Sequence, residues 1–372
     1  MKAWPKVALG DLFKVEKGKI GIMAATPGDF PLVTTGEALS SHFERHFSGD
    51  AVCIPLISAT GHGHASLKRL HHVEGEFAVG SILCACVNQA PDRVMARYAY
   101  YYLSACKEPV LIPLMKGTAN MSMKVADIVG VEIPLPPLTE QQALVVRLDA
   151  LAEKTRQVEV HLDAVERDAE HLLALRFRDA IAHAPLRMMA EVAPLVRREV
   201  DIDLQTSYTE LGVRSFYKGT FQRRTVPGSD FSWQDLYRIQ SGDLIFSNIM
   251  AWEQAIAIAK PEDDGCVGNH RMLSCEAKAD IAIPGFLWYY FTTDEGFANI
   301  YAASPGTAAR NRTMTASALM AIKVPIPPVA TQQAFNRLQA EVAALKAKHA
   351  AICQAKAALL PATLERVFSG GD

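Results

Sequence analysis

The chain has 372 residues, of which 49% are hydrophobic and 21% are charged, and its formal net charge at pH 7 is −2. This length is sufficient for two or three domains with separate cores. The near-neutral charge excludes a bulk attraction to nucleic acid or to anionic membranes, so any contact with DNA must rely on local basic faces or on a partner.

Two features indicate the compartment in which the protein works. The seven cysteines form no regular framework and are interpreted as free thiols in a reducing environment. The N-terminal segment lacks the apolar run of a signal peptide, and no stretch approaches the length of apolar sequence that a membrane span needs. We therefore expect a cytoplasmic protein.

Residues 1–138 have the pattern of a mixed domain. Short apolar and β-branched runs such as GDAVCIPLIS (49–58) alternate with Gly, Pro, Asn and Asp, which predicts short strands joined by turns. The aromatic segment near 97–106 is interpreted as one of a few helices. Because residues 185–329 show the same pattern, for example in GDLIFSNIMAW (242–252), we expect an α+β domain in each range.

A proline-rich joint, IPLPPLTEQQ (133–142), ends the first domain. Proline lacks a backbone N–H and biases the residue before it towards extended geometry, so helix entry is delayed until after Pro137. Thr139 is then placed to cap a helix, and Gln142 three residues later completes a capping box. A spacer helix is predicted over residues 139–184.

Apolar or small residues recur along this helix at alternating intervals of four and three, which is typical of a coiled-coil seam. The predicted seam consists of Leu144, Leu148, Leu151, Thr155, Val158, Leu162, Val165, Ala169 and Leu172. A second helix, predicted over residues 330–368, continues the pattern at Phe335, Leu338, Val342, Leu345, His349, Ile352, Lys356 and Leu359. The simplest partner for each seam is the other one, in an antiparallel pair.

The second half of the chain is an imperfect copy of the first. VPIPPVATQQ (324–333) repeats the joint, with Ala334 where a capping box needs Glu or Gln, so we expect a weaker helix start there. Three further matches follow in the same order: KGTANMSM (116–123) with PGTAARNRTM (305–314), RYAYYYLS (97–104) with GFLWYYFT (285–292), and VGSILCA (79–85) with SGDLIFS (241–247). The predicted fold is a pseudo-two-fold dumbbell, with two similar domains separated by a long antiparallel two-helix coiled coil.

The two joints, the KGTA and PGTA segments before them and the two-copy layout resemble the specificity subunits of type I restriction-modification systems. The resemblance covers essentially the whole chain. It implies that each globular domain is a target recognition domain that reads one half of a bipartite double-stranded DNA site. It also implies that the coiled coil sets the half-site spacing and docks two methyltransferase subunits, with restriction subunits able to join. On this interpretation the chain is not an enzyme and needs no cofactor of its own.

Contacts to duplex DNA need Arg or Lys for phosphates and guanine, and Asn or Gln for adenine. In the first domain the candidates are Thr35, Arg45, Thr60, His62, Lys68, Arg69, Lys116, Asn120 and Lys124. In the second domain they are Arg214, Tyr217, Lys218, Arg223, Arg224, Asn269, Arg271, Arg310, Asn311 and Arg312. For each single residue, a solvated surface position is the alternative interpretation.

The residues expected to form the spacer and to dock the partner lie at the helix starts and along the seams. They are Thr139, Glu140, Gln142, Leu148, Leu151, Val158, Leu162, Gln332, Gln333, Leu338, Val342, Leu345 and Ile352.

Other classes of function remain open at the level of the sequence. The near-neutral charge and the aromatic residues in RSFYKGTF (214–221) permit a coiled-coil scaffold that presents two protein-binding heads without DNA specificity. A hydrolytic or transfer enzyme that uses HGH (62–64) or Cys53 lacks a supporting constellation of residues. Four histidines at positions 62, 64, 71 and 72 lie near Cys84 and Cys86, but the paired spacing of a metal site is missing, so no metal is expected.

Overall fold

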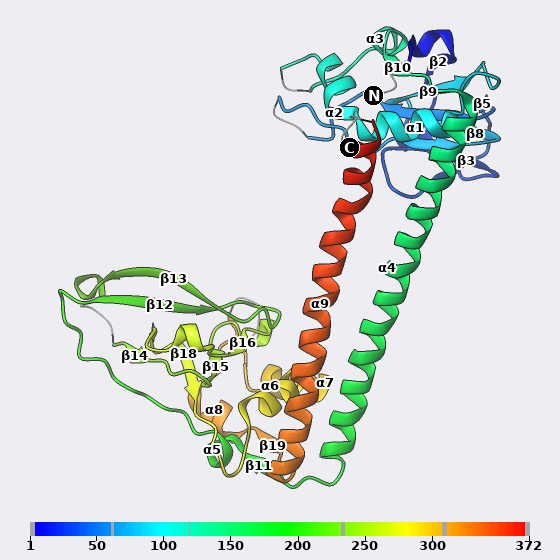
Figure 1. The fold of residues 1–372 in the computed structure, drawn as a ribbon. Coiled ribbons are helices and arrows are strands. Elements are labelled where there is room, and N and C mark those ends of the chain that lie inside the picture. Colours follow the sequence, from blue (N-terminus) through cyan, green and yellow to red (C-terminus); the bar gives the residue numbers. More distant parts are fainter. Residues whose placement is uncertain (1–3, 61–62, 119, 232–234, 307–310, 369–372) are drawn as a thin grey trace. The chain divides into compact units, whose positions relative to one another are not determined.

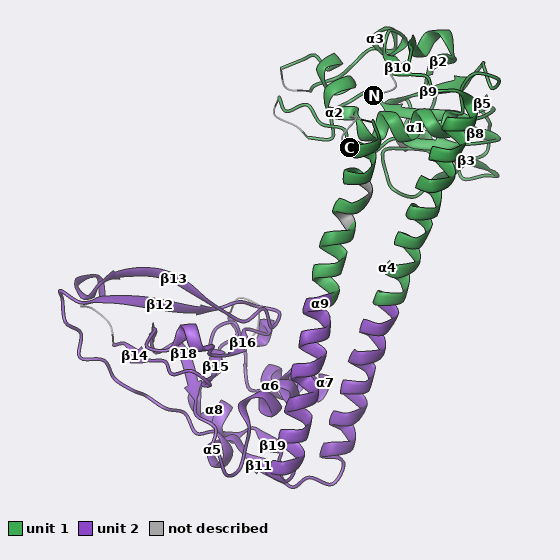
Figure 2. Ribbon diagram, viewed as in Figure 1, with its two compact units in different colours: residues 1–162, 349–372 green, residues 163–348 purple. Residues whose placement is uncertain are grey.

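The protein is described here by a computed structural model, which covers residues 4–60, 63–118, 120–231, 235–306 and 311–368 (Figure 1). The chain forms two compact units: unit 1 comprises residues 1–162 and 349–372, and unit 2 comprises residues 163–348 (Figure 2). Each unit contains a globular head together with part of each of the two long helices. The prediction of mixed α and β structure with a long helix is confirmed.

The head of unit 1 is built from two four-stranded sheets with the strand orders β2-β9-β6-β7 and β4-β3-β8-β5. Its strands are β1 (Lys6–Ala8), β2 (Phe13–Lys17), β3 (Phe30–Val33), β4 (Ser40–His42), β5 (Phe47–Ser48), β6 (Ala51–Pro55), β7 (His71–Val73), β8 (Glu76–Val79), β9 (Leu83–Asn88) and β10 (Glu132–Pro134). Its helices are α1 (Ala96–Ala105), α2 (Lys107–Val110) and α3 (Val125–Val129). All five residues of β6 are buried because both faces of this strand are covered: Val52 and Ile54 lie in one core cluster, and Ala51 and Cys53 lie in another. This explains its uninterrupted apolar sequence.

The head of unit 2 contains a four-stranded sheet of order β13-β12-β17-β14 and a three-stranded sheet of order β16-β15-β18. Its strands are β11 (Leu186–Met188), β12 (Ser207–Val213), β13 (Thr220–Pro227), β14 (Tyr237–Arg238), β15 (Leu244–Ser247), β16 (Ile256–Ile258), β17 (Val267–Gly268), β18 (Met272–Cys275) and β19 (Lys323–Pro325). Its helices are α5 (Met189–Val192), α6 (Pro284–Thr292), α7 (Asp294–Ala302) and α8 (Ala316–Ala321).

Each head has a joint of the same kind, in which the first strand of the head pairs with its last strand. β1 pairs antiparallel with β10, and β11 pairs antiparallel with β19. In unit 1 the backbone N–H of Leu135 donates to the carbonyl of Pro5 at 2.8 Å, and in unit 2 that of Ile326 donates to Pro185 at 3.0 Å. The extended geometry that proline imposes therefore closes each head just before its helix begins.

The sequence match of VGSILCA (79–85) with SGDLIFS (241–247) is wrong. β15, which follows Ser-Gly-Asp at 241–243, corresponds to β6, which follows Ser-Gly-Asp at 48–50. Each of these strands is flanked in its sheet by two antiparallel neighbours, β9 and β7 for β6 and β18 and β16 for β15. The residues from 83 onwards instead form β9, which takes the place of β18.

The two long helices are α4 (Leu138–Ile181) and α9 (Val329–Phe368), and they run antiparallel within each unit. In unit 1, Lys356 of α9 pairs with Glu159 of α4 at 2.9 Å and donates to the carbonyl of Thr155 at 3.3 Å. In unit 2, Lys346 forms an ion pair with Glu170. Among the described residues, none of the helices is both long enough and apolar enough to cross a membrane.

The predicted seam is correct only in part. Leu148 and Val342 are buried, whereas the side chains of Val158, Leu172, Ile352 and Leu359 are 44–46% exposed. A straight α-helix drifts by roughly 20° per heptad from a strict seven-residue repeat. Residues spaced alternately by four and three positions therefore turn away from the buried face along the helix. The buried stripe instead moves to Leu173 and Phe177 in α4 and to Leu364 in α9.

Both helices begin in the same way, which corrects the predicted difference between the joints. α4 begins at Leu138, so Thr139 lies within the first turn, and neither the Thr139 cap nor the capping box with Gln142 forms as predicted. The first-turn N–H groups bond instead to the carbonyl of Pro137 in α4 and of Pro328 in α9. The second helix start is therefore complete as well, without a capping box.

A buried glutamine fastens each helix start to its head. The Gln141 amide donates to the carbonyls of Pro136 at 2.8 Å and Arg93 at 2.9 Å, and its oxygen accepts from the N–H of Met95 at 2.9 Å. Met95 is the residue before α1. This three-bond contact, which we call the glutamine clamp, holds the first turn of α4 against the start of α1.

The same clamp recurs in unit 2. Gln332 donates to the carbonyls of Pro327 at 2.8 Å and Ile281 at 2.9 Å, and accepts from the N–H of Ile283, the residue before α6, at 2.9 Å. Gln141 and Gln332 are both fully buried, while Gln142 and Gln333 are exposed. The first glutamine of each pair is thus the one that organises the joint.

Candidate nucleic-acid interface

In the first head, two of the predicted DNA-contacting segments lie side by side. The N–H of Ser58 donates to the carbonyl of Met121 at 2.8 Å, and the N–H of Met123 donates to Leu56 at 2.9 Å. Lys116 and Ser122 exchange two further backbone bonds of 2.8 and 2.9 Å, which fold 116–122 back on itself. This pairing brings the exposed candidates Thr60, Lys116, Asn120 and Lys124 onto neighbouring loops.

The remaining candidates of the first head are partly neutralised by acidic neighbours. Arg69 forms an ion pair with Glu37 at 2.9 Å, and Arg45 forms one with Glu76. Thr35 is half-buried, Lys68 is exposed, and His62 lies outside the described residues. Among the described candidates of this head, Lys68, Lys116 and Lys124 are the cations that lie outside these two ion pairs.

In the second head, three candidates from two segments meet around one hollow. Arg223 from β13 and Asn269 and Arg271 from the loop between β17 and β18 line a hollow of about 290 Å³. Glu210 on its wall forms ion pairs with Arg223 at 3.3 Å and with Arg224 at 3.2 Å. We call this feature the basic hollow.

The segment before α8 lies next to the basic hollow through one continuous backbone connection. The N–H of Met314 donates to the carbonyl of Asn248 at 2.8 Å, and the N–H of Asn248 donates to Arg271 at 2.9 Å. The exposed Asn311 belongs to this segment, whereas Arg310 lies outside the described residues. Arg312 is half-buried, with its guanidinium 3.8 Å from the ring centre of Tyr301 and a bond of 2.9 Å to the Ser304 carbonyl, so it organises the loop internally.

The first head has the same backbone connection at the corresponding place. Met123 bonds to Leu56, as above, and the N–H of Leu56 donates to the carbonyl of Ile82 at 2.8 Å. A hollow of about 410 Å³ lies there, and its lining includes Lys17, Ser122 and Lys124. Each head thus presents a hollow where the end of its central strand meets the segment before its last short helix.

The turn between β12 and β13 carries the other candidates of the second head. Phe216 and Tyr217 have left-handed backbone conformations with φ values of 59° and 54°. Arg214 stacks over Phe221 at 4.6 Å, and Lys218 lies 5.7 Å from the ring centre of Phe216. Tyr217 points inward, and its hydroxyl donates to the carbonyl of Phe291 at 2.7 Å. It therefore packs within the head and does not present its hydroxyl on the surface.

The residues weighed for enzymatic or metal chemistry lie in other surroundings. Cys53 and Cys86 are buried on central strands, and burial raises the pKa of the Cys53 thiol well above its usual range. His72 lies with Asp50 and Glu74 in a group of possible ligand atoms within 4.8 Å of one another. Arg97 contacts Nδ1 of His72 at 3.1 Å, and a guanidinium only donates, so Nε2 of a neutral ring must carry the proton and donate to Asp50. That tautomer does not offer Nε2 to a metal.

Sequence reasoning missed three residues that the structure makes prominent. Gln141 is adjacent to the predicted Gln142, and repetition of the Gln-Gln pair in both joints was the available sign. Arg97 and Asp149 form an ion pair of 2.8 Å across 52 residues, which no local pattern reveals.

Of the predicted docking residues, Thr139, Gln142 and Gln333 are exposed at the helix starts, while Glu140 accepts a bond of 3.1 Å from Nε1 of Trp4.

Comparison with known protein families gives one match. Residues 1–167 match the family described as type I restriction modification DNA specificity domain. A comparison with curated protein sequences found no match. This match contains the first proline joint and confirms the resemblance over residues 1–167.

Three solved structures share the fold over almost the whole chain. The HsdS subunit from Thermoanaerobacter tengcongensis is 18% identical, with a TM-score of 0.57, and the alignment covers 100% of this chain and 97% of that one. The type I restriction-modification S subunit from M. genitalium is 13% identical, with a TM-score of 0.51 and coverage of 96% and 95%. A chain from a structure of complex assembly and conformational transition of the type I R-M system is 16% identical, with a TM-score of 0.62 and coverage of 99% and 98%.

Proposed function

Because residues 1–167 match the type I restriction modification DNA specificity domain, we propose that this chain gives a methyltransferase complex its DNA sequence specificity. The heads, residues 1–138 and 185–329, each read one half of a bipartite site. The helices, residues 139–184 and 330–368, form the antiparallel spacer of a pseudo-two-fold dumbbell, set the half-site separation and dock two methyltransferase subunits. The chain performs no chemical step itself, needs no cofactor, and acts on cellular DNA in the cytoplasm, where restriction subunits can join.

The observation that carries this proposal is the pair of equivalent hollows in the two heads. The basic hollow joins Arg223, Asn269 and Arg271, and the hollow of the first head includes Lys17 and Lys124. Arginine binds guanine in the major groove through two hydrogen bonds, and asparagine binds adenine in the same way. A head that gathers these side chains beside exposed loops has the chemistry to read bases and to hold phosphates.

The charge distribution supports a role that depends on a partner. The net charge is only −2, and Arg45, Arg69 and Arg223 each have an acidic partner, so part of the positive charge of each head is already compensated. Affinity for DNA falls with salt in proportion to the number of phosphates neutralised. The isolated chain therefore binds duplex DNA weakly, and sequence-selective binding requires the assembled complex.

The test is to map methylated bases in DNA exposed to the complex of this chain with its methyltransferase. The variant Arg271→Ala relaxes one half of the split motif and leaves the other half unchanged, because each lost base contact costs about 1–3 kcal/mol at one position. Lys323→Ala serves as the matched control, since it removes an exposed cation from β19 outside the basic hollow. A complex of wild-type chain that shows no sequence preference would refute the proposal and favour a scaffold without DNA specificity.

A further inference from the structure

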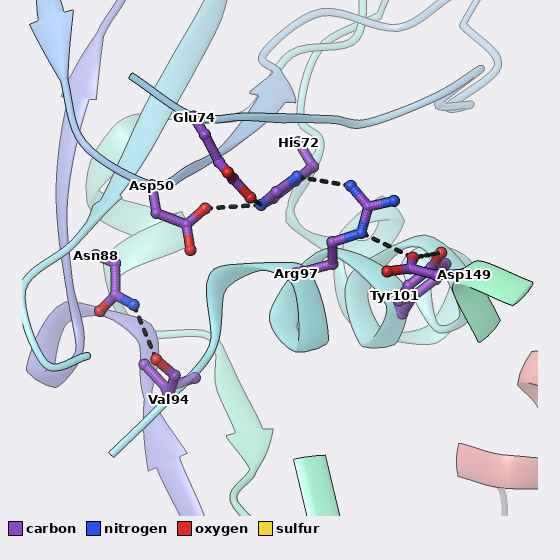
Figure 3. A network of polar contacts seen from close by, with 8 residues as sticks. All are labelled: Asp50, His72, Glu74, Asn88, Val94, Arg97, Tyr101 and Asp149. Carbon is purple, nitrogen blue, oxygen red and sulfur yellow. Dashed lines mark hydrogen bonds and ion pairs between the residues drawn. The ribbon is translucent and has the colours of Figure 1, made fainter. Parts of the chain in front are cut away.

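A chain of polar contacts links the first head to α4 (Figure 3). Nε2 of His72 contacts Asp50 at 2.7 Å, and Nδ1 of the same ring accepts from Arg97 at 3.1 Å. Arg97 Nε donates to Asp149 of α4 at 2.8 Å, and the Tyr101 hydroxyl donates to the same carboxylate at 2.5 Å. We call the four residues His72 of β7, Arg97 and Tyr101 of α1 and Asp149 of α4 the Arg97 pin; Asp50, in the turn before β6, anchors its His72 end.

The pin orients the head more than it stabilises it. The side chains of Arg97 and Asp149 are 38% and 37% exposed, so their attraction is screened by water. A guanidinium that contacts an imidazole and a carboxylate at once nevertheless has only one compatible placement. Burial lowers the pKa of Arg97, but the bond and the charge of Asp149 outweigh it and raise that pKa.

The corresponding positions in unit 2 can be assigned from two independent markers, the glutamine clamps and the Ser-Gly-Asp segments. The glutamine clamps equate Gln141 with Gln332, which places Ala340 of α9 where α4 has Asp149. The same clamps equate the starts of α1 and α6, which places Gly285 at the position of Arg97 and Tyr289 at that of Tyr101. The Ser-Gly-Asp segments and the strand registers place Ala257 at the position of His72.

Three of the four pin residues are therefore replaced by Ala or Gly in unit 2. Ala257, Gly285, Tyr289 and Ala340 all line one hollow of about 1030 Å³, together with Trp288 and Gln339. The space that the pin fills in unit 1 is thus open in unit 2. Asp243, the counterpart of Asp50, is bound by Arg198 at 2.6 and 3.1 Å, so its charge is satisfied within the head.

We propose that Arg97 is a positioning residue that fixes the angle of the first head on α4. The second head, which lacks this polar pin and packs on its helices through the apolar rings of Phe177 and Phe335, is then oriented on them less strictly. This inference rests on the proposed function, because the angle of a head decides which half-site spacings the complex accepts. Adding one base pair between half-sites moves them apart by about 3.4 Å and rotates them by about 34°. A head held by the Arg97 pin resists this change of distance and rotation, whereas a head without such a pin adjusts its orientation to the shifted half-site.

The primary test uses the full chain in complex with its methyltransferase and DNA with the native spacer or one base pair more or less. Arg97→Gly, which introduces the residue of unit 2, raises methylation at the altered spacings relative to the native spacing by about threefold, the size of the coupling expected for a partly exposed ion pair. Arg97→Lys restores part of the discrimination, because it keeps the charge but loses the two-sided contact. A purely structural role would lower methylation equally at all spacings, and that result, or an unchanged spacing profile, would overturn the inference.

A second variant tests the other half of the inference. The combination Ala257→His, Gly285→Arg and Ala340→Asp installs the pin in unit 2, where Tyr289 already supplies the hydroxyl. The Asn336 amide oxygen, which lies 2.1 Å from the position of a new Cβ at Gly285, is at the end of a flexible side chain and can move aside. Narrower spacing tolerance than in the wild type is expected, and an unchanged tolerance would contradict a loosely held second head.

A double-mutant cycle separates this inference from the proposed function. Arg97→Ala and Asp149→Ala are measured singly and together in urea unfolding of the isolated chain, with no DNA present. A non-additive effect on the unfolding equilibrium constant supports the pin even if the complex proves not to be sequence-selective. Additive effects overturn the pin whatever the DNA results show.

Discussion

Replacement of Gln141 by Met is expected to destabilise unit 1 strongly. Met has a similar length and flexibility, so packing is nearly kept while all three clamp bonds are lost. Those bonds join the fully buried amide to Pro136, Arg93 and Met95 at 2.8–2.9 Å. Each bond contributes about 0.5–1.5 kcal/mol, and the Met95 N–H is left without its partner, so the expected loss is about 3 kcal/mol in the free energy of unfolding.

The assay is urea unfolding followed by circular dichroism, with hydrogen exchange of peptides from α1 and the start of α4 to assign the transition to unit 1. A loss of about 3 kcal/mol raises the unfolding equilibrium constant by about 100-fold. Gln142→Met is the matched control, because this neighbouring side chain is exposed and surface changes stay within about 0.5 kcal/mol. Gln332→Met and Gln333→Met repeat the comparison in unit 2. If Gln141→Met and Gln142→Met shift the transition equally, the clamp does not fasten the joint.

Three further outcomes are expected. Arg198→Ala leaves Asp243, whose side chain is 3% exposed, as an uncompensated buried charge, and lowers the free energy of unfolding by about 3 kcal/mol in a urea titration. Burial raises the pKa of Tyr217 to about 12. Its neutral form therefore stabilises the fold fully below about pH 10, and this contribution is lost as the pH rises from about 10 to 12. Absorbance at 295 nm detects the ionisation of the phenol at high pH. Burial raises the pKa of Cys275 to about 12, so iodoacetamide at pH 8 labels the half-buried Cys353 but not Cys275 in the folded protein, as peptide mass spectrometry detects.

Each of these outcomes has a comparison that separates it from a general loss of folding. Glu276→Ala removes the exposed acidic partner of Arg198 and costs less than about 1 kcal/mol. Tyr217→Phe removes one of the tyrosine ionisations near pH 12, which Tyr102 and Tyr290 also show, and an unchanged titration amplitude there would contradict the assignment. Labelling of Cys275 at the rate of Cys353 without denaturant would contradict its burial in β18.

The sequence predicted the parts of the fold that local chemistry decides. Prolines at 134, 136 and 137 and at 325, 327 and 328 mark both joints, because a proline restricts its neighbours whatever the rest of the chain does. The long helices followed from their apolar repeat, which also selected Leu148 and Val342 correctly. The errors at Val158 and Ile352 arose because a strict seven-residue repeat drifts off the buried face of a straight helix over several heptads.

The candidate site was predicted by residue type and not by arrangement. Arg223, Asn269 and Arg271 were each selected for their hydrogen-bonding chemistry, but their meeting around one hollow depends on strand pairings that span more than 40 residues. Tyr217 was selected for the same reason, yet the left-handed turn at Phe216 and Tyr217 turns it towards Phe291. Local composition does not distinguish an aromatic residue that faces solvent from one that closes a core.

The comparison of the two units separates what the fold requires from what each head requires. The glutamine clamp is present in both because every helix start must satisfy its buried polar groups. The pin is present in one, since Ala257, Gly285 and Ala340 can pack without it. A chimera that moves the second head onto α4 would therefore keep its joint through Gln141 but place Gly285 opposite Asp149, leaving that carboxylate without its guanidinium. Exchange of heads between such chains should thus transfer sequence preference more faithfully than spacing preference, unless an arginine at the position of Arg97 is carried with the head.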